Sequence, residues 1–187
     1  MNSELGDRQR WNDRYAGGEE GGTPLMLGRN LHLFPRSGRA LDVAGGPGQA
    51  AVILAARGLE VTVCDVSDVA LEMAGERAAR SGVQIETVAA DLTDDRLPPG
   101  PWDLITCFNY LDRTLFPRMI DELADGGRLA LTIATRSNLE RNEHPRAEFL
   151  LDDGEMPSLL GDLAIEYYEE GWKLDGRHCA ELIARKV

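Results

Sequence analysis

The 187-residue chain has few lysines and few cysteines, and it contains no long hydrophobic run. Lysine occurs only as Lys173 and Lys186, and 20 basic residues stand against 32 acidic ones, which gives a net charge of −12 at pH 7. Such a charge repels nucleic-acid backbones and anionic membrane surfaces. No uncharged apolar run approaches the roughly 20 residues of a membrane span, and the N-terminus lacks the apolar core of a signal peptide. The sequence therefore predicts a cytoplasmic protein with no nucleic-acid and no membrane partner.

The cysteines are too few and too scattered for a disulfide framework or a zinc site. They are Cys64, Cys107 and Cys179, an odd number without CxxC spacing, and each lies in an apolar, strand-like run. Buried reduced thiols are therefore expected, and no metal ion. A metalloid site at Cys64 and Cys107 is disfavoured, because strand alternation turns Cys64 away from the acid that follows it.

The composition favours one folded domain with a helical extension. Hydrophobic residues make up 43% of the chain and charged residues 28%, which excludes a disordered or collagen-like chain. Residues 5–15 predict a short helix, and Thr23 and Pro24 are typical of the N-cap and first turn of a helix through residue 33. Four glycines within residues 17–22 predict a mobile joint between them. We expect residues 1–36 to form an N-terminal helical lid segment and residues 37–187 the main domain.

From residue 39 onward, strand and helix patterns alternate. The expected strands are 40–43, 60–65, 84–89, 102–108 and 128–134, and the expected helices are 49–57, 68–80 (with Ser67 as N-cap) and 114–124. This alternation predicts an α/β fold, with a parallel sheet and helices on both faces. Residues 163–168 and 179–184 are also strand-like, and the loop between them is too short for a parallel crossover. They should form an antiparallel hairpin.

A glycine-rich loop lies between the first predicted strand and the first helix of this domain, where residues 41–51 read LDVAGGPGQAA. In an open parallel sheet, ligands bind beyond the carboxyl ends of the strands, and glycines let them approach the backbone. The spacing Gly46-x-Gly48-x-x-Ala51 also satisfies the dinucleotide fingerprint, whose glycines receive a pyrophosphate. Asp42 lies just ahead of the glycines, where its carboxylate would repel a pyrophosphate but attract a cationic centre. The position therefore favours a cationic adenosyl ligand over a nicotinamide dinucleotide.

Two further acids follow the next two predicted strands. Asp65 closes the second strand, where an acid can accept both hydroxyls of a ribose. Asp91 follows the third, where it could accept a hydrogen bond from an adenine amino group while Val66 and Leu92 sandwich the ring. Three acids at consecutive strand ends are hard to reconcile with a phosphate ligand.

The sequence resembles the class I S-adenosylmethionine-dependent methyltransferases. Asp42-x-Ala44-x-Gly46-x-Gly48 matches the acid-and-glycine loop of that family, and we expect Ala44, which replaces its first glycine, to need only an ordinary backbone conformation. Residues 108–117, 142–151 and 168–172 are similar to segments of the tellurite-resistance (TehB-like) and thiopurine-type small-molecule branch. The resemblance implies a Rossmann-like seven-stranded sheet of order 3-2-1-4-5-7-6, with the hairpin as strands 6 and 7.

The same resemblance implies a cofactor, S-adenosylmethionine, with S-adenosylhomocysteine as product, and a set of residues that hold it. These residues are Asp42, Ala44, Gly45, Gly46 and Gly48 at the methionyl part, Asp65 and Val66 at the ribose, Asp91 and Leu92 at the adenine, and Asn109 and Tyr110 beside the sulfonium. Residues 11–15 resemble the N-terminal lid of the family, so Trp11, Arg14 and Tyr15 are expected to close over the cofactor. The prolines that mark nucleic-acid amine methyltransferases are missing after Asn109, which favours a small-molecule acceptor.

Methyl transfer from a sulfonium requires alignment rather than a protein nucleophile. A thiolate or a metalloid oxyanion is already nucleophilic, whereas a hydroxyl or an amine needs a base, for which His144, Asp112 and His178 are the candidates. Arg113 and Arg146 are candidates for orienting an anionic acceptor.

Three functions therefore remain open. The favoured function is a methyltransferase for a small molecule such as a thiol, a metalloid oxyanion or a thiopurine-like compound, acting as a monomer or homodimer. The alternatives are a non-catalytic module that binds S-adenosylmethionine and, less favoured, a nicotinamide-binding oxidoreductase.

Overall fold

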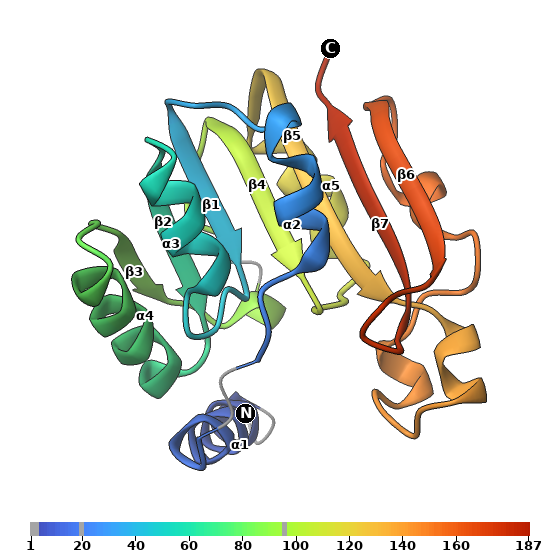
Figure 1. Ribbon diagram of the computed structural model, residues 1–187, viewed down its shortest axis with the longest axis horizontal. Coiled ribbons are helices and arrows are strands. Elements are labelled where there is room, and N and C mark those ends of the chain that lie inside the picture. The colour runs from blue at the N-terminus through green and yellow to red at the C-terminus, as the bar shows by residue number, and fades with distance from the viewer. Residues whose placement is uncertain (1–3, 19–20, 95–96) are drawn as a thin grey trace.

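The computed structural model describes residues 4–18, 21–94 and 97–187, which form one seven-stranded sheet with helices around it (Figure 1). The strands are β1 (Arg39–Val43), β2 (Glu60–Asp65), β3 (Glu86–Ala89), β4 (Trp102–Phe108), β5 (Leu123–Ala134), β6 (Ala164–Trp172) and β7 (His178–Arg185). The α-helices are α1 (Glu4–Ala16), α2 (Leu25–Asn30), α3 (Gln49–Ala56), α4 (Asp68–Arg80) and α5 (Leu115–Asp121). The segment between β5 and β6 contains short 3-10 turns at Arg136–Glu140, Ala147–Phe149 and Met156–Leu159.

The sheet order is β3-β2-β1-β4-β5-β7-β6, which confirms the predicted order. The strands from β1 to β5 pair in parallel, and β7 pairs antiparallel with both β5 and β6. The predicted hairpin is therefore confirmed as well. Because the parallel strands share one direction, the residues that follow them gather at a single edge of the sheet.

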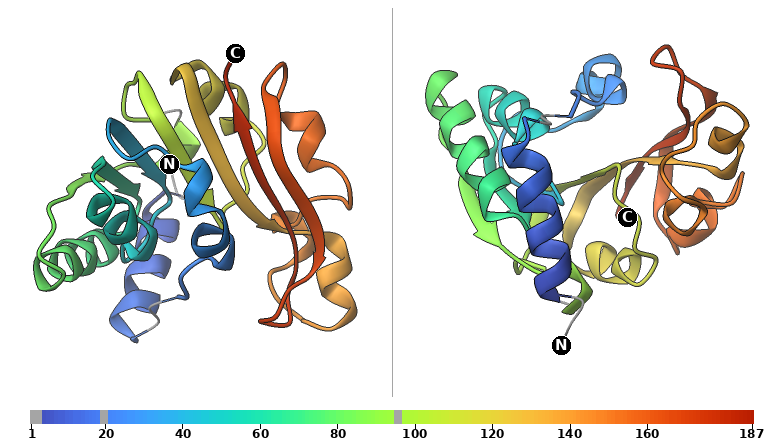
Figure 2. Two further views of the ribbon diagram at one scale, coloured as in Figure 1. Left: turned by 45° about the horizontal axis from the view of Figure 1, so that its top comes forward. Right: turned by 90° about the horizontal axis from the view of Figure 1, so that it is seen from below.

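Helices cover both faces of the sheet, as predicted (Figure 2). On one face, Met26 and Leu27 of α2 and Leu54 of α3 are fully buried against residues of the central strands. On the other face, Phe116 and Met119 of α5 are buried in a second cluster. Of the predicted lid segment 1–36, α2 thus packs onto the sheet, and only α1 lies across the strand edge.

Some predicted boundaries need correction. The helix expected over 114–124 ends at Asp121, because Leu123 already pairs with Trp102 as the start of β5. The fifth strand accordingly begins five residues earlier than predicted. Thr23 does not cap α2, whose N-cap is Pro24. Strand β3 begins at Glu86 rather than at residue 84.

Other predictions from the sequence match the structure closely. Ser67 caps α4, with its Oγ accepting a hydrogen bond from the backbone N–H of Ala70 at 3.1 Å. All three cysteines are free and buried, as expected, and burial raises the pKa of the Cys64 thiol to about 12. Across the described part of the chain, no helix has the length and apolar character that crossing a membrane requires. Within the predicted glycine joint, Glu19 and Glu20 lie outside the described residues.

Candidate functional site

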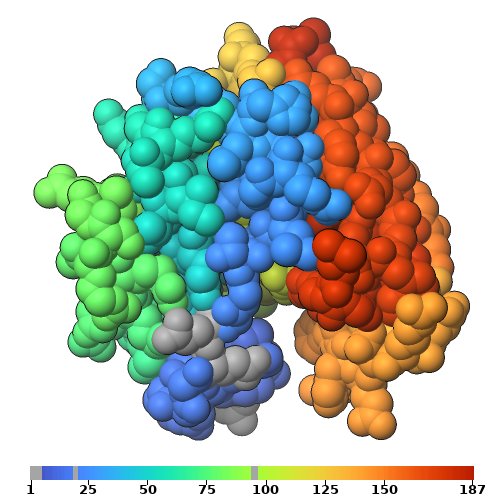
Figure 3. All heavy atoms as spheres, viewed as in Figure 1, coloured from blue at the N-terminus to red at the C-terminus, as the bar shows by residue number. Residues whose placement is uncertain are grey.

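The carboxyl ends of the parallel strands form the floor of the candidate site. Helix α1 lies on one side of this edge, and the segment 136–160 lies on the other (Figure 1). The space-filling view shows the surface hollowed between these two segments (Figure 3). The glycine loop, the acids after β2 and β3 and the residues after β4 all belong to this edge.

The loop after β1 turns sharply through residues with left-handed backbone. Gly46 and Gly48 have φ of 51° and 74°, and Ala44 has φ of 51° as well. The expectation that Ala44 needs only an ordinary conformation is therefore wrong. The loop is held in place because the N–H of Gly45 donates to the carbonyl of Cys64 at 3.2 Å and the N–H of Gly48 to the carbonyl of Gly45 at 3.1 Å. The tight turn demands the positive φ at Ala44, where Cβ crowds the following carbonyl.

The glycines of this loop also leave no room for a side chain. A Cβ on Gly45 would lie 2.6 Å from Oδ2 of Asp42, and one on Gly48 would lie 2.8 Å from Cβ of Ala74. Above the loop, a Cβ on Gly46 would lie 2.8 Å from the hydroxyl of Tyr15. Packing beneath the loop thus requires glycine at position 48, whereas the close atom at Gly46 is the far end of the Tyr15 side chain.

Asp42 is a buried carboxyl group with one unsatisfied oxygen. Its relative exposure is 1%, and its Oδ1 accepts a hydrogen bond from Oγ1 of Thr106 at 2.7 Å. No group among the described residues donates a hydrogen bond to Oδ2. Burial, with a smaller contribution from the nearby charge of Asp65, raises the pKa of Asp42 to about 7. A cationic or N–H donor group of a ligand is what this oxygen lacks.

Asp65 at the end of β2 holds the loop and the next helix together. Its Oδ2 accepts from the N–H of Gly46, and its Oδ1 accepts from the N–H of Ser67, each at 2.9 Å. Burial raises the pKa of this carboxyl, and the backbone hydrogen bonds oppose that rise. Each carboxylate oxygen retains lone-pair capacity for a further donor.

The predicted adenine residues lie at the ends of β2 and β3. Leu92 is buried in the core cluster of the α5 face, whereas Val66 and Asp91 are half-buried. Oδ1 of Asp91 accepts from the backbone N–H of Thr93 at 3.0 Å and from its hydroxyl at 2.7 Å. Among the described residues, none donates a hydrogen bond to the second carboxylate oxygen of Asp91, which a ligand donor could therefore reach.

Helix α1 is docked onto the start of α4. The Oδ1 atom of Asn12 accepts from the hydroxyl of Ser67 at 2.6 Å, and Arg8 forms an ion pair with Asp68 at 3.1 Å. These contacts place the helix across the strand edge (Figure 2). The docked helix brings the predicted lid residues to the glycine loop.

The aromatic residues of α1 form one face, as their spacing of four predicts. The rings of Trp11 and Tyr15 are stacked with their centroids 5.7 Å apart, and the guanidinium of Arg14 lies 4.9 Å from the Trp11 ring. The Tyr15 hydroxyl reaches the glycine loop at Gly46.

Asn109 and Tyr110 follow β4. Asn109 has a left-handed backbone, with φ of 61°, and its N–H donates to the carbonyl of Thr132 at 2.7 Å. Its Oδ1 accepts a hydrogen bond from Nη1 of Arg177, at 2.8 Å. Arg177 is a site residue that the sequence reasoning missed, because it is 68 positions away. Tyr110 is partly buried, and burial raises its pKa above the usual range.

The candidate bases and the candidate arginines are not gathered into one cluster. Oδ1 of Asp112 accepts from the N–H and the hydroxyl of Thr114, so it belongs to a local turn. Arg113 makes two charged hydrogen bonds to Glu155, at 2.5 and 2.7 Å, which tie the start of α5 to the segment 136–160. This pairing gives Arg113 a structural partner instead of an open guanidinium.

The two candidate histidines differ in their surroundings. Nδ1 of His178 lies 2.6 Å from Oγ1 of Thr135, and its ring meets that of Trp172 edge-on at 5.1 Å. This ring is therefore held as part of the β7 packing. His144 is exposed in the loop after β5, as is Arg146, whose guanidinium lies 3.5 Å from Glu148. Among these candidates His144, Arg146 and Arg113 are exposed, and both arginines have an acidic partner.

Comparison with known proteins finds similarity in the part of the chain that contains the glycine loop. A family model described as a methyltransferase domain matches residues 40–127. The ubiquinone biosynthesis O-methyltransferase of Xylella fastidiosa is 31% identical over 123 residues, which are 61% of this chain and 49% of that protein. The chain spans less than half the length of the curated relatives it matches. The predicted resemblance to the class I methyltransferases is thereby confirmed for the segment that carries the glycine loop.

Solved structures show that the whole fold is shared. The TehB protein of Haemophilus influenzae has a TM-score of 0.73 at 17% identity, over 95% of this chain and 67% of that one. The N-methyltransferase NodS of Bradyrhizobium japonicum, crystallised with S-adenosylhomocysteine, has a TM-score of 0.68 at 22% identity, over 86% of this chain and 83% of that one. The chain thus has the Rossmann-like methyltransferase fold.

Proposed function

We propose that this chain is an S-adenosylmethionine-dependent methyltransferase that acts on a small molecule. The observation that carries the proposal is Asp42, a buried carboxyl group with one unsatisfied oxygen beside a loop whose glycines pack closely against their surroundings. A ligand that brings a positive ammonium group to this oxygen lowers the free-energy cost of burying the carboxylate. A pyrophosphate at the same place would be repelled by the carboxylate charge. The same point weighs against a nicotinamide dinucleotide at this loop.

The residues present fit the cofactor in charge and in shape. Those proposed to hold it are Asp42, Ala44, Gly45, Gly46, Gly48, Asp65, Val66, Asp91, Leu92, Asn109, Tyr110, Trp11, Arg14 and Tyr15. When bound, S-adenosylmethionine supplies an activated methyl group on a sulfonium. Asp42 and the loop fix the amino acid end, Asp65 takes the ribose hydroxyls, and the stacked aromatic rings of α1 exclude water from above.

The acceptor enters from the hollow between α1 and the segment 136–160. Exposed His144 and Arg146 lie on that segment, and we assign them to the acceptor side as a base and an anion-orienting group. Matched relatives are named ubiquinone biosynthesis O-methyltransferase and demethylmenaquinone methyltransferase. We therefore add hydroxylated aromatic rings to thiols, metalloid oxyanions and thiopurine-like compounds as proposed acceptors. We further propose that the protein acts in the cytoplasm, as a monomer or homodimer, without a nucleic-acid partner.

Calorimetric titration with S-adenosylhomocysteine tests the cofactor assignment. The parent protein is expected to bind it and not to bind NADH. Asp65→Ala should weaken binding by about 1.5–3 kcal/mol, the value of a charge-assisted hydrogen bond. Asp121→Ala, which removes an exposed acid, serves as the matched control and should bind like the parent. Equal affinity of Asp65→Ala and the parent would show that the ribose lies elsewhere.

A screen of acceptors tests the transfer itself. Thiols, selenite, tellurite, thiopurines and hydroxylated aromatic rings are offered with S-adenosylmethionine, and released S-adenosylhomocysteine is measured. Release that depends on one acceptor class identifies the enzyme. Tight cofactor binding without release in the presence of any acceptor would instead support a non-catalytic binding module.

A further inference from the structure

The turn between β6 and β7 reaches from the far side of the sheet to the residue after β4. It spans residues 173–177 and is closed by two backbone hydrogen bonds, from Lys173 N to the carbonyl of Arg177 at 2.8 Å and from Gly176 N to the carbonyl of Lys173 at 3.0 Å. At its end, Nη1 of Arg177 donates to Oδ1 of Asn109. This hydrogen bond joins a hairpin at one end of the sheet to the candidate site.

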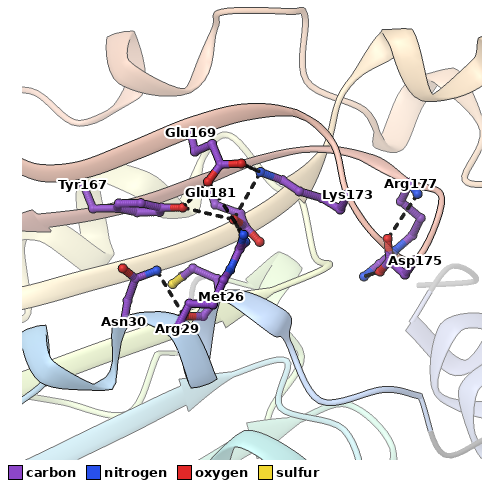
Figure 4. Close-up of polar contacts among 9 residues, drawn as sticks. All are labelled: Met26, Arg29, Asn30, Tyr167, Glu169, Lys173, Asp175, Arg177 and Glu181. Atoms are coloured by element: carbon purple, nitrogen blue, oxygen red, sulfur yellow. Dashed lines mark hydrogen bonds and ion pairs between the residues drawn. The ribbon is translucent and has the colours of Figure 1, made fainter.

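The base of this turn is anchored in the protein interior (Figure 4). The ammonium of Lys173 lies 3.2 Å from the carboxylate of Glu181, and both side chains are almost fully buried, with exposures of 4% and 2%. Arg29 of α2 contacts the same carboxylate at 2.5 Å, and Glu169 holds the Lys173 ammonium from the other side at 3.1 Å. A buried charge so enclosed keeps the start of the turn in one place.

Arg177 is in turn fixed by Asp175. The carboxylate of Asp175 accepts from the backbone N–H of Arg177 at 3.1 Å and from its Nε at 2.9 Å (Figure 4). Nη2 of Arg177 also lies 2.8 Å from Oδ2 of Asp175, so two of the three guanidinium nitrogens contact this carboxylate, and the third, Nη1, donates to Asn109. The turn therefore presents Arg177 to Asn109 with little freedom.

This contact decides which end of the Asn109 carboxamide faces the site. A guanidinium can only donate hydrogen bonds, so the oxygen of the Asn109 carboxamide faces Arg177, and the NH2 group is the end that is turned away from Arg177. The strand order β1-β4-β5-β7 places Asn109 between the glycine loop and the turn. The NH2 group can therefore be directed to the side of the glycine loop, where the cofactor and acceptor would meet.

We propose that Arg177 is a positioning residue that makes Asn109 present a hydrogen-bond donor to the methyl acceptor, so that the site selects an acceptor oxygen over an amine. A hydroxyl or phenolate oxygen has a lone pair to accept this hydrogen bond and another to attack the methyl carbon, whereas the single lone pair of an amine nitrogen cannot do both. The inference rests on the proposed function and narrows its acceptor class. In the transfer, His144, the base proposed above, would take the hydroxyl proton, the oxygen would form a bond to the methyl carbon, and the C–S bond would break with its electron pair going to sulfur.

The first test measures the carboxamide directly. The side-chain amide signals of Asn109 are recorded by NMR with bound S-adenosylhomocysteine, and they are assigned by their loss in Asn109→Asp. We expect Arg177→Met to shift these signals, Arg177→Lys to retain most of the parent positions, and Asp175→Asn to fall between. The matched control, Arg185→Met, removes an arginine that pairs with Glu166 at the other end of β7 and should shift nothing. Unchanged Asn109 signals in Arg177→Met would overturn the proposal.

The second test measures the choice of acceptor atom. Catechol, 1,2-diaminobenzene and 2-aminophenol differ only in hydroxyl and amine groups. With S-adenosylhomocysteine bound, catechol should shift the Asn109 amide signals and the diamine should not. With S-adenosylmethionine, 2-aminophenol should be methylated on oxygen, and Arg177→Met should lower the ratio of O- to N-methyl product by about tenfold, the value of one hydrogen bond.

The outcomes separate this inference from the function on which it rests. Failure of the parent protein to bind S-adenosylhomocysteine would defeat the proposed function. Binding without a catechol-induced shift, a preference for nitrogen, or the same product ratio in Arg177→Met and the parent would defeat the positioning role alone. If Arg177→Met does not fold, Arg177→Lys and Asp175→Asn give the same comparison with smaller expected shifts.

Discussion

The change Asp42→Asn tests whether the buried carboxyl group of the candidate site lowers the stability of the folded protein when it ionises. The carboxyl group is 1% exposed, and only one of its two oxygens has a partner among the described residues. Burial raises its pKa to about 7, from an ordinary value of 3.8. The folded state therefore binds this proton more tightly than the unfolded state does.

The sign of the effect follows from that difference. As the pH rises from about 4 to about 7, the unfolded chain releases the proton of Asp42 freely, whereas the folded protein resists its loss. Asp42 therefore lowers the free energy of unfolding progressively between about pH 4 and pH 7, and the full decrease is reached above pH 7. Between pH 5.5 and pH 8 the expected loss is about 2 kcal/mol. Asparagine does not titrate, so the variant should lack this part of the pH dependence.

Urea unfolding at a series of pH values measures the difference. The free energy of unfolding of Asp42→Asn, minus that of the parent, should rise by about 2 kcal/mol from pH 5.5 to pH 8. Contributions from groups that do not interact with Asp42 cancel in this difference. The control, Asp121→Asn, makes the same change in charge at an exposed position and should give a nearly flat difference. A flat difference for Asp42→Asn would refute the reasoning.

Three further predictions follow from the same site. Ala44→Gly should stabilise the protein by about 1 kcal/mol, because relief of the left-handed strain exceeds the entropy that glycine adds to the unfolded chain, and thermal unfolding will show it. Gly45→Ala places a Cβ 2.6 Å from Oδ2 of Asp42, so calorimetry should find S-adenosylhomocysteine binding weakened at least about tenfold, with Gly6→Ala as the unaffected control. Hydrogen exchange of residues 8–16 should slow when S-adenosylhomocysteine is added, and unchanged exchange would contradict a lid.

The fold could be predicted because its signals are local and agree with one another. The β-branched run Glu60–Asp65 and the cap at Ser67 define β2 and the start of α4 with the observed bounds. The end of α5 could not be predicted in this way. Leu123 and Ala124 look like the end of an amphipathic helix, but pairing with Trp102 draws Leu123 into β5. A contact over 21 positions overrides the local preference there.

The candidate site could be predicted where residues follow consecutive strands, as Asp42, Asp65 and Asp91 do. Two features of the site could not be predicted from the sequence. The left-handed φ of Ala44 escaped because alanine is an unusual choice for that conformation. The hydrogen bond from Arg177 to Asn109 escaped because its two residues belong to β-strand ends that only the sheet order brings together. Local patterns carry no information on such a pair.

The energetically unfavourable features of the chain are concentrated at one edge of the sheet. Ala44 and Asn109 are the two described residues other than glycine with positive φ, and both lie where a parallel strand ends. Asp42, with its unsatisfied buried oxygen, lies one strand position before Val43 at the same edge. Each feature lowers stability by about 1–3 kcal/mol when nothing is bound. Strain at a functional site persists when the surrounding structure enforces it and a ligand relieves it. A ligand with a cationic group near Asp42 should therefore stabilise this fold by more than its own contacts with the glycine loop, because it also satisfies the carboxylate.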